Sequence, residues 1–192
     1  MLPLVLASSS AYRRELLSRL HLPFEAISPH LDESPLPGEA PLATCERLAQ
    51  EKALKIVPSH PRALIIGSDQ IALLNGQLVG KPGNHANAVQ QLQQASGQEM
   101  TFHTALCLLN AETGRLQLER VVVTVQYRTL SLGQIERYLA VDHPYDCAGS
   151  GRIETLGITL VERVKSDDPT ALIGLPLISL TNMLLNEGIA LP

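Results

Sequence analysis

Cysteine is scarce and scattered in this sequence of 192 residues. The three cysteines, Cys45, Cys107 and Cys147, are odd in number and far apart, so the sequence indicates neither a disulfide framework nor a paired-cysteine zinc site. They are typical of reduced thiols in a cytosol. We therefore expect a cytoplasmic location.

Long apolar runs are also absent. Charge, glycine or proline interrupts every stretch before the roughly 20 residues that span a bilayer are reached. The apolar residues 1–7 are too short for a signal peptide, and Arg13 and Arg14 follow them rather than precede them. We expect no membrane contact. The formal net charge of -4 gives no overall attraction for nucleic acid, so any anion site must be local.

Several common motifs are missing as well. The sequence has no GxSxG elbow, which argues against a serine hydrolase. Residues 149–151 lack the third glycine and the strand and helix of a dinucleotide fingerprint. The six histidines show no metal-ligand spacing. Because the chain has no repeat or linker and 45% of its residues are hydrophobic, we expect a single domain over residues 1–192.

Apolar strands and amphipathic helices alternate early in the chain, and hairpins occupy its middle. This order predicts an α/β or α+β fold with a mixed sheet. We expect the second strand to end at Gly67 and a tight turn at residues 75–76. The expected strands are 4–7, 63–66, 71–74, 77–79, 100–109, 116–127 and 158–163, and the expected helices are 11–20, 42–56, 87–95, 131–141 and 176–188.

The first predicted helix begins with a departure from a local rule. Arg13 and Arg14 lie in its first turn, where the helix dipole disfavours cations by about 0.3 to 1 kcal/mol each. Such departures concentrate at functional sites, and serines before a helix N-terminus supply donors for a phosphate. Ser8, Ser10 and Arg13 are therefore candidate phosphate ligands. A simple cap at Ser10 with two solvated arginines fits the same pattern.

Lys52 falls on the apolar stripe of the second predicted helix, so its ammonium group should point toward the protein. This position fits either a snorkelling aliphatic stem or a charge that faces a phosphate site. Asp69 follows a buried strand, at the end where α/β proteins place catalytic groups.

The predicted hairpin places Lys81 opposite Gln70 and close to Asp69. Strict alternation would direct Asp69 and Lys81 to opposite faces, unless Gly80 introduces a bulge. An ordinary cross-strand ion pair and a catalytic role both fit. Glu154 follows the glycine turn and fits either a substrate contact or an exposed surface position.

The order and spacing of these residues resemble the Maf-like nucleoside triphosphate pyrophosphatases over nearly the whole chain. The resemblance favours the functional interpretation of Arg13, Lys52, Asp69 and Lys81. It rests on SSSxxRRxLL at 8–17, DE at 32–33, QEKA at 50–53, GSDQ at 67–70 and GKP at 80–82, extended by CAGS at 147–150, Glu154, GITL at 157–160 and GLPL at 174–177.

The resemblance implies an elongated mixed sheet flanked by helices, like that of inosine triphosphate pyrophosphatases, with a central substrate cleft and possible homodimers. It also implies that Asp69 is the catalytic proton acceptor. Arg13, Lys52 and Lys81 can form a positive clamp on phosphoryl oxygens. Because a free carboxylate is a weak base toward water, we expect Glu33 and Asp69 to hold Mg²⁺ or Mn²⁺ with substrate oxygens.

Within the resemblance, GSDQ and Glu154 point to the branch that hydrolyses the α–β phosphoanhydride of 7-methyl-GTP to 7-methyl-GMP and diphosphate. Tyr12, Gln70 and Glu154 would then set specificity, since a methylated guanine carries positive charge that Tyr12 and the Glu154 carboxylate favour. Two alternatives stay open. One is a dTTP and UTP pyrophosphatase of the same family, and the other is a non-catalytic nucleotide-binding regulator of cell division.

Overall fold

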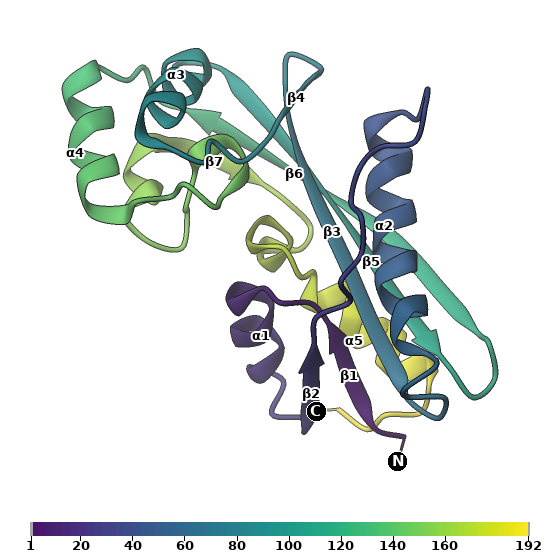
Figure 1. Ribbon diagram of the computed structural model, residues 1–192. Helices are drawn as coiled ribbons and strands as arrows, with labels where there is room; N and C mark the ends of the chain where they lie inside the picture. The colour runs from purple at the N-terminus through teal and green to yellow at the C-terminus, as the bar shows by residue number, and fades with distance from the viewer. Residues whose placement is uncertain (1, 192) are drawn as a thin grey trace. The chain divides into compact units, whose positions relative to one another are not determined.

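The computed structural model describes residues 2–191, which form a mixed sheet with flanking helices (Figure 1). This confirms the predicted fold class. The strands are β1 (Leu4–Ala7), β2 (Phe24–Ile27), β3 (Leu64–Leu74), β4 (Gln77–Val79), β5 (Glu99–Asn110), β6 (Leu116–Tyr127) and β7 (Val161–Lys165). The α-helices are α1 (Ala11–Ser18), α2 (Pro41–Ile56), α3 (His85–Ala95), α4 (Leu132–Asp142) and α5 (Leu177–Asn186), and the 3₁₀ helices are η1 (Ala148–Ser150), η2 (Leu156–Leu160) and η3 (Pro169–Ile173).

The strands pair in the order β2-β1-β3-β5-β6-β7, with β4 beside β3. β1 pairs in parallel with both β2 and β3, whereas β4 pairs antiparallel with β3 and β7 pairs antiparallel with β6. The stretch of β3 that pairs with β1 ends at Ile66, opposite Leu6 near the carboxyl end of β1. The segments that follow Ala7 and Ile66 therefore lie near each other.

Contacts divide the chain into two compact units. The first comprises the described residues up to Gln70, Thr104–Val121 and those from Asp168 onward, and the second comprises Ile71–His103 and Val122–Asp167. The long strands β3, β5 and β6 contribute residues to both units. The single domain, the elongated form and the cleft that we expected from the sequence stay predictions.

The sheet of the first unit has two covered faces. On one face, alternate residues of β1, β3 and β5 pack against α1 and α5 in an apolar core. α2 covers the other face and turns its buried stripe toward the strands (Figure 1). The core on the α1 and α5 face includes Leu4, Leu6, Leu16, Leu17, Leu64, Ile66, Leu106, Leu108, Leu175, Leu180 and Leu184.

Gly67 allows α2 to pack directly on β3. A Cβ atom at this position would overlap the carbonyl oxygen of Ala49 and lie 3.0 Å from the backbone nitrogen of Ala53. The absence of a side chain therefore serves close packing. The prediction that a strand ends at Gly67 is wrong, because β3 continues through it to Leu74.

Two other sequence expectations need correction. β2 was not expected, since its four residues at the sheet edge are only partly buried and give no clear alternation. The strand expected at 158–163 begins at Val161, because residues 156–160 form η2. An apolar composition alone does not separate a short 3₁₀ segment from a strand.

Local signals in the second unit are confirmed. Asn75 and Gly76 both have positive φ, as a two-residue hairpin turn requires, and Leu74 pairs with Gln77. Ser131 starts α4 with the expected capping box. None of the helices within residues 2–191 is long and apolar enough to cross a bilayer.

Candidate active site

Three of the predicted phosphate ligands, Ser8, Ser10 and Arg13, lie together where β1 leads into α1. Ser10 caps the helix, and its hydroxyl accepts a hydrogen bond from the Arg13 backbone N–H at 3.4 Å. The Ser8 hydroxyl, which is buried, accepts from the Ser10 backbone N–H at 3.2 Å and from Nη1 of Arg13 at 3.4 Å. The cap interpretation of Ser10 is therefore confirmed, but Arg13 is held against the protein.

Arg13 is oriented by a backbone carbonyl from a distant part of the chain. Its Nε donates to the Gly174 carbonyl oxygen at 2.8 Å. Burial is the main influence on the guanidinium and lowers its pKa, while the charges of Asp69 and Glu33 act in the opposite direction. The side chain thus stands in the electrostatic field of these two carboxylates.

Lys52 links the same two carboxylates. Its Nζ lies 2.7 Å from Asp69 Oδ1 and 2.9 Å from Glu33 Oε1. The side chains of Lys52 and Asp69 are only 5% and 11% exposed, whereas that of Glu33 is 55% exposed. The predicted inward direction of Lys52 is confirmed. The snorkelling interpretation is wrong, because the ammonium group itself is buried and paired.

Cys45 is a buried, neutral thiol next to Asp69. Its Sγ donates to the backbone carbonyl oxygen of Asp69 at 3.4 Å. Burial, reinforced by the charge of Asp69, raises the pKa of the thiol to about 12. A thiolate is the nucleophilic form of cysteine, so this residue is unsuited to attack a phosphate.

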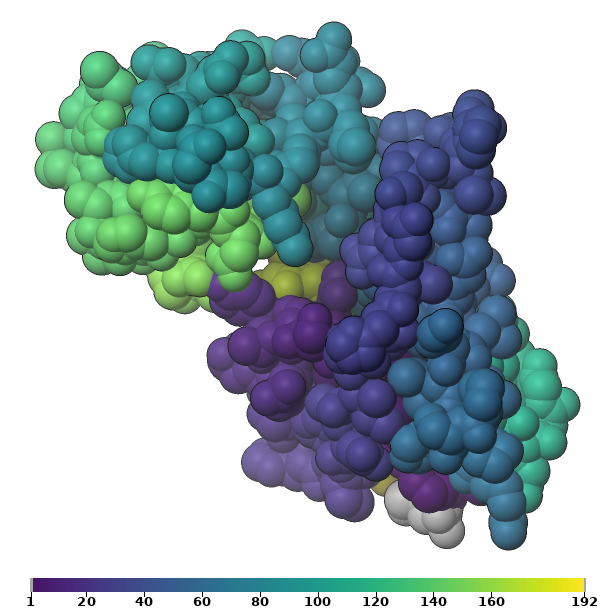
Figure 2. Space-filling view, viewed as in Figure 1, coloured from purple at the N-terminus to yellow at the C-terminus, as the bar shows by residue number. Residues whose placement is uncertain are grey.

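Glu33 is carried by a loop that is fastened to α2. Arg47 of α2 makes a two-pronged contact with Glu39, at 2.7 Å from Nε to Oε1 and 2.8 Å from Nη2 to Oε2, and Nη2 also donates to the Ser34 carbonyl at 3.1 Å. Figure 2 shows this loop, residues 28–40, lying along α2. The adjacent Asp32 is exposed and accepts a local hydrogen bond from the Ser34 N–H.

Gln70 lies on the face of β3 opposite Asp69. Its Nε2 donates to Thr104 Oγ1 at 2.9 Å and to the carbonyl oxygens of Ala171 at 2.8 Å and Leu172 at 3.1 Å. Side chains alternate along a strand, so Asp69 faces α2 while Gln70 faces the segment around η3. The structure does not bring Gln70 to the carboxylate cluster.

Within segment 168–177, sequence reasoning named residues 174–177 but overlooked residues 168–173, whose carbonyl oxygens hold Gln70. Gly174 accepts hydrogen bonds from Arg13 and Ser68, and Asp168 caps η3 ahead of Pro169. A signal for this segment was present in the sequence. An aspartate directly before a proline is typical of a helix start.

The remaining predicted site residues are spread over both units. Tyr12 is half-buried and precedes Arg13 in α1. Lys81 and Glu154 are exposed residues of the second unit, where Lys81 follows β4 and Glu154 lies between η1 and η2. The paired register of β3 and β4 extends from Leu74 and Gln77 to Ala72 and Val79. The roles of Lys81 and Glu154 stay predictions.

The donor set on the first unit fits a magnesium-like cation. Among residues 2–191, no group of three or more His, Cys, Asp or Glu side chains is arranged around a common metal position. Mg²⁺ does not need such a cage, because one or two carboxylates together with substrate phosphates commonly hold it. Asp69 and Glu33 meet that requirement, since both carboxylates already pair with the ammonium group of Lys52.

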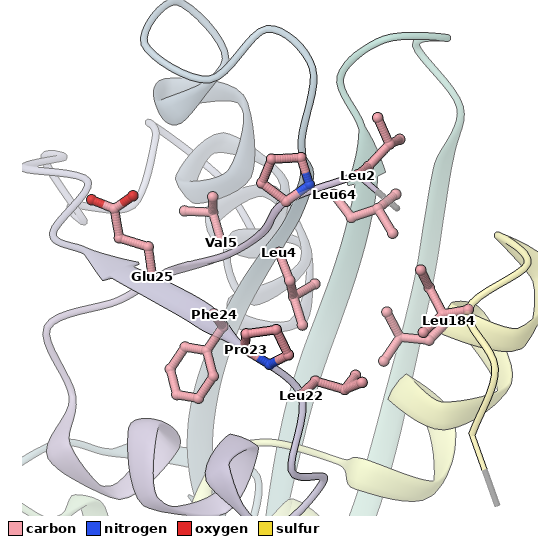
Figure 3. Close-up of a pocket in the computed structure, with 11 residues that line it drawn as sticks. Leu2, Leu4, Val5, Leu22, Pro23, Phe24, Glu25, Leu64 and Leu184 are labelled. Atoms are coloured by element: carbon pink, nitrogen blue, oxygen red, sulfur yellow. The ribbon is translucent and has the colours of Figure 1, made fainter.

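An apolar cavity of about 380 Å³ lies elsewhere in the first unit (Figure 3). Leu4, Leu22, Phe24 and Leu64 line it, with Glu25 as its one charged side chain. Leu64 and Asp69 are five positions apart on β3, which corresponds to roughly 16 Å along an extended strand. Neither this distance nor the apolar lining suits a phosphate group.

Residues 3–187 match the family model described as Maf-like protein. Two curated proteins named 7-methyl-GTP pyrophosphatase are similar to this chain. The one from Pseudomonas fluorescens is 56% identical, and the match covers 100% of both chains. The one from Ralstonia nicotianae is 56% identical, and the match covers 96% of this chain and 95% of the relative. A solved HAM1 protein from Coxiella burnetii covers 66% of this chain and 73% of its own, with 15% identity and a TM-score of 0.43. Because the family model spans nearly all of the sequence, this chain belongs to the Maf-like protein family.

Proposed function

We propose that this protein is a nucleoside triphosphate pyrophosphatase that hydrolyses the α–β phosphoanhydride of 7-methyl-GTP to 7-methyl-GMP and diphosphate. The observation that carries the proposal is the buried pairing of Lys52 with Asp69, joined by Glu33 and in the field of Arg13. The names of relatives that match the whole length of the chain support the choice of substrate.

The chemistry requires a positioned water, neutralised phosphoryl oxygens and a stabilised diphosphate leaving group. Arg13 and Lys52 supply positive charge at a largely buried position, where an ion pair is worth more than in open water. The hydroxyl of Ser8 and the start of α1 add hydrogen-bond donors for phosphate. Asp69 orients the attacking water and accepts its proton.

Glu33 and Asp69 would hold a divalent cation, Mg²⁺ or Mn²⁺, together with the substrate oxygens. When bound, such a cation neutralises phosphate charge and lowers the pKa of a bound water. Lys52 pairs with both carboxylates and compensates part of their negative charge. The ammonium group of Lys52 would also bind the substrate phosphates.

Recognition of the base belongs to residues outside this cluster. Tyr12, beside Arg13, offers an aromatic face to a cationic methylated guanine, and the carboxylate of Glu154 offers a negative charge and an acceptor for its N–H groups. We propose Lys81 as a further cationic ligand of the phosphate groups. Gln70 contributes to specificity indirectly. It holds the backbone at Ala171 and Leu172, and its side chain lies on the face of β3 opposite Asp69.

Diphosphate release from a panel of nucleotides tests this function. We expect release from 7-methyl-GTP in the presence of Mg²⁺, slower release from GTP, dTTP and UTP, and none after the metal is removed with EDTA. Preference for dTTP and UTP would favour the other pyrophosphatase activity of the family. Binding without release from any nucleotide would instead favour a regulator, and it would remove Asp69 from the catalytic role.

The variant Glu154→Ala tests base recognition separately from hydrolysis. We expect it to reduce the preference for 7-methyl-GTP over GTP while total turnover of GTP changes little, because the lost carboxylate contacts the base. Steady-state kinetics with both nucleotides measure the ratio. An unchanged ranking of the two substrates would contradict the assignment of Glu154.

A further inference from the structure

Asp168 precedes η3, at the start of the segment whose Gly174 carbonyl oxygen accepts a hydrogen bond from Arg13. The residue is 2% exposed. One carboxylate oxygen accepts from the backbone N–H of Thr170 at 3.0 Å and from the Thr170 hydroxyl at 2.6 Å. The other accepts from the backbone N–H groups of Ile178 at 2.7 Å and Ser179 at 3.4 Å. Asp168 therefore ties the start of η3 to the first turn of α5.

Thr170 adds a second link between η3 and the start of α5. Its hydroxyl accepts from the backbone N–H of Leu177 at 2.8 Å while donating to Asp168. Both ends of segment 168–177 are thus fixed by one carboxylate and one hydroxyl. Little freedom is left for the backbone between them.

Between those fixed ends, the segment presents its carbonyl oxygens to the sheet. The Gly174 carbonyl accepts from Arg13 Nε at 2.8 Å and from Ser68 Oγ at 2.9 Å. The Ala171 carbonyl accepts from Gln70 Nε2 and from Thr104 Oγ1, both at 2.8 Å. Movement of this segment would therefore move the guanidinium group of Arg13.

We propose that Asp168 is a positioning residue for Arg13, which sets the place of the phosphate-binding guanidinium through the carbonyl oxygen of Gly174. The proposal rests on the proposed function only in taking Arg13 as a phosphate ligand. A displacement of roughly 1 Å at a binding group can cost up to about a hundredfold in rate. The φ of 112° at Gly174 is one that residues with a side chain rarely adopt, so the carbonyl that holds Arg13 requires a glycine at this position.

The substitution Asp168→Asn tests this path. An asparagine keeps one acceptor but turns N–H donors toward backbone N–H groups on one side, so the junction opens. We expect the Kd for inorganic triphosphate, measured by calorimetry, to rise about tenfold, and the KM for 7-methyl-GTP to rise with it. In an Arg13→Ala background the same substitution should change the Kd little, because the residue through which it acts is gone.

Two matched variants separate positioning from loss of stability. Ser131→Ala removes a comparable helix cap in the second unit and should leave triphosphate binding unchanged. If Asp168→Asn does not fold, Thr170→Val replaces it in the same cycle and Thr170→Ser, which keeps the hydroxyl, should restore binding. Wild-type affinity in Asp168→Asn, or an equal loss with and without Arg13, would overturn the proposal.

These outcomes also distinguish the two proposals. Binding of inorganic triphosphate depends neither on the base nor on hydrolysis. Coupling between Asp168 and Arg13 without diphosphate release from any nucleotide would sink the proposed function and leave the positioning role standing. Release of diphosphate from 7-methyl-GTP without this coupling would support the proposed function and overturn the positioning role of Asp168.

Discussion

At the scale of single residues, the site depends on a buried ammonium group that two carboxylates share. Lys52 contacts Asp69 and Glu33 at short distances while its own side chain is almost inaccessible. Removal of one charged partner from such a buried cluster leaves an uncompensated charge, which lowers the free energy of unfolding. The cluster therefore holds the ammonium group of Lys52 in a fixed position, where a polyanionic ligand could bind it.

Asp69→Asn tests the role of the central carboxylate. An amide cannot accept a proton from water, so kcat for diphosphate release should fall by about a hundredfold or more. Arg13 and Lys52 remain, and we expect inorganic triphosphate to bind at least as tightly as in the wild type. Steady-state kinetics and calorimetry measure the two quantities.

The control for this variant is Glu15→Gln, an acid-to-amide change on α1 at a side chain that is 72% exposed. It should leave both quantities unchanged. Turnover retained in Asp69→Asn would mean that another group accepts the proton.

At the scale of elements, the contact between α2 and β3 brings Lys52 to Asp69, and Gly67 makes that contact possible. We expect Gly67→Ala to reduce the free energy of unfolding by about 1 to 3 kcal/mol, because the added methyl group overlaps the backbone of α2. Denaturation in urea measures this change. Gly80→Ala is the matched control, since a Cβ atom there meets no neighbour within 4 Å. Equal stability of the two variants would contradict the packing role.

The loop that carries Glu33 depends on the pairing of Glu39 with Arg47. The hydrogen bonds from Arg47 are the main cause that lowers the pKa of Glu39 from 4.5 to about 2. A carboxyl group with a depressed pKa in the folded state stabilises that state above its unfolded pKa, and this contribution is lost as the pH falls toward the folded pKa. The contribution should therefore be complete above about pH 4.5 and fade toward about pH 2.

Glu39→Gln makes this dependence measurable. The difference in unfolding free energy between wild type and variant should be largest near neutral pH and shrink as the pH falls from about 4.5 to about 2. Glu15→Gln serves as the exposed control and should show no such trend. A difference that stays constant through this range would exclude the pairing as its cause.

At the scale of the whole molecule, the cysteines report on folding. Within residues 2–191 the cysteines form no disulfide; Cys45 and Cys107 are buried, and Cys147 is partly accessible. Burial raises the pKa of both Cys45 and Cys107 to about 12. A thiol reagent should therefore label one cysteine quickly in the native protein and the other two only as the first unit unfolds.

Cys147→Ser should abolish the fast phase of labelling and leave the slow phase intact. Labelling followed spectroscopically at increasing urea concentrations measures both phases. Rapid reaction of three thiols in native conditions would show that the core around α2 and β5 opens far more readily than its burial indicates.

Much of this architecture could be predicted from the sequence because its signals are local. The hairpin at Asn75 and Gly76, the capping box at Ser131 and the inward direction of Lys52 each follow from neighbouring residues. The continuation of β3 through Gly67 could not be predicted, since it depends on a helix that packs from elsewhere in the chain.

The candidate site divides in the same way. The cluster of Ser8, Ser10 and Arg13 was suggested by the dipole rule that Arg13 breaks, and the structure brings these residues together. The place of Gln70 was not predictable, because the face that it occupies is decided by the register of β3 against its neighbours. The support that Gly174 gives to Arg13 spans 161 positions and leaves no local trace.

The alternation along β3 restricts how the gene for this protein can change in length. Asp69 faces α2, whereas its neighbours Ser68 and Gln70 bond to segment 168–177 on the opposite side. Deletion of one codon between Leu64 and Asp69 would rotate the carboxylate away from Lys52 and bury it against backbone carbonyl oxygens. Homologous enzymes that use this acid should therefore differ in length within that stretch by two residues or by none.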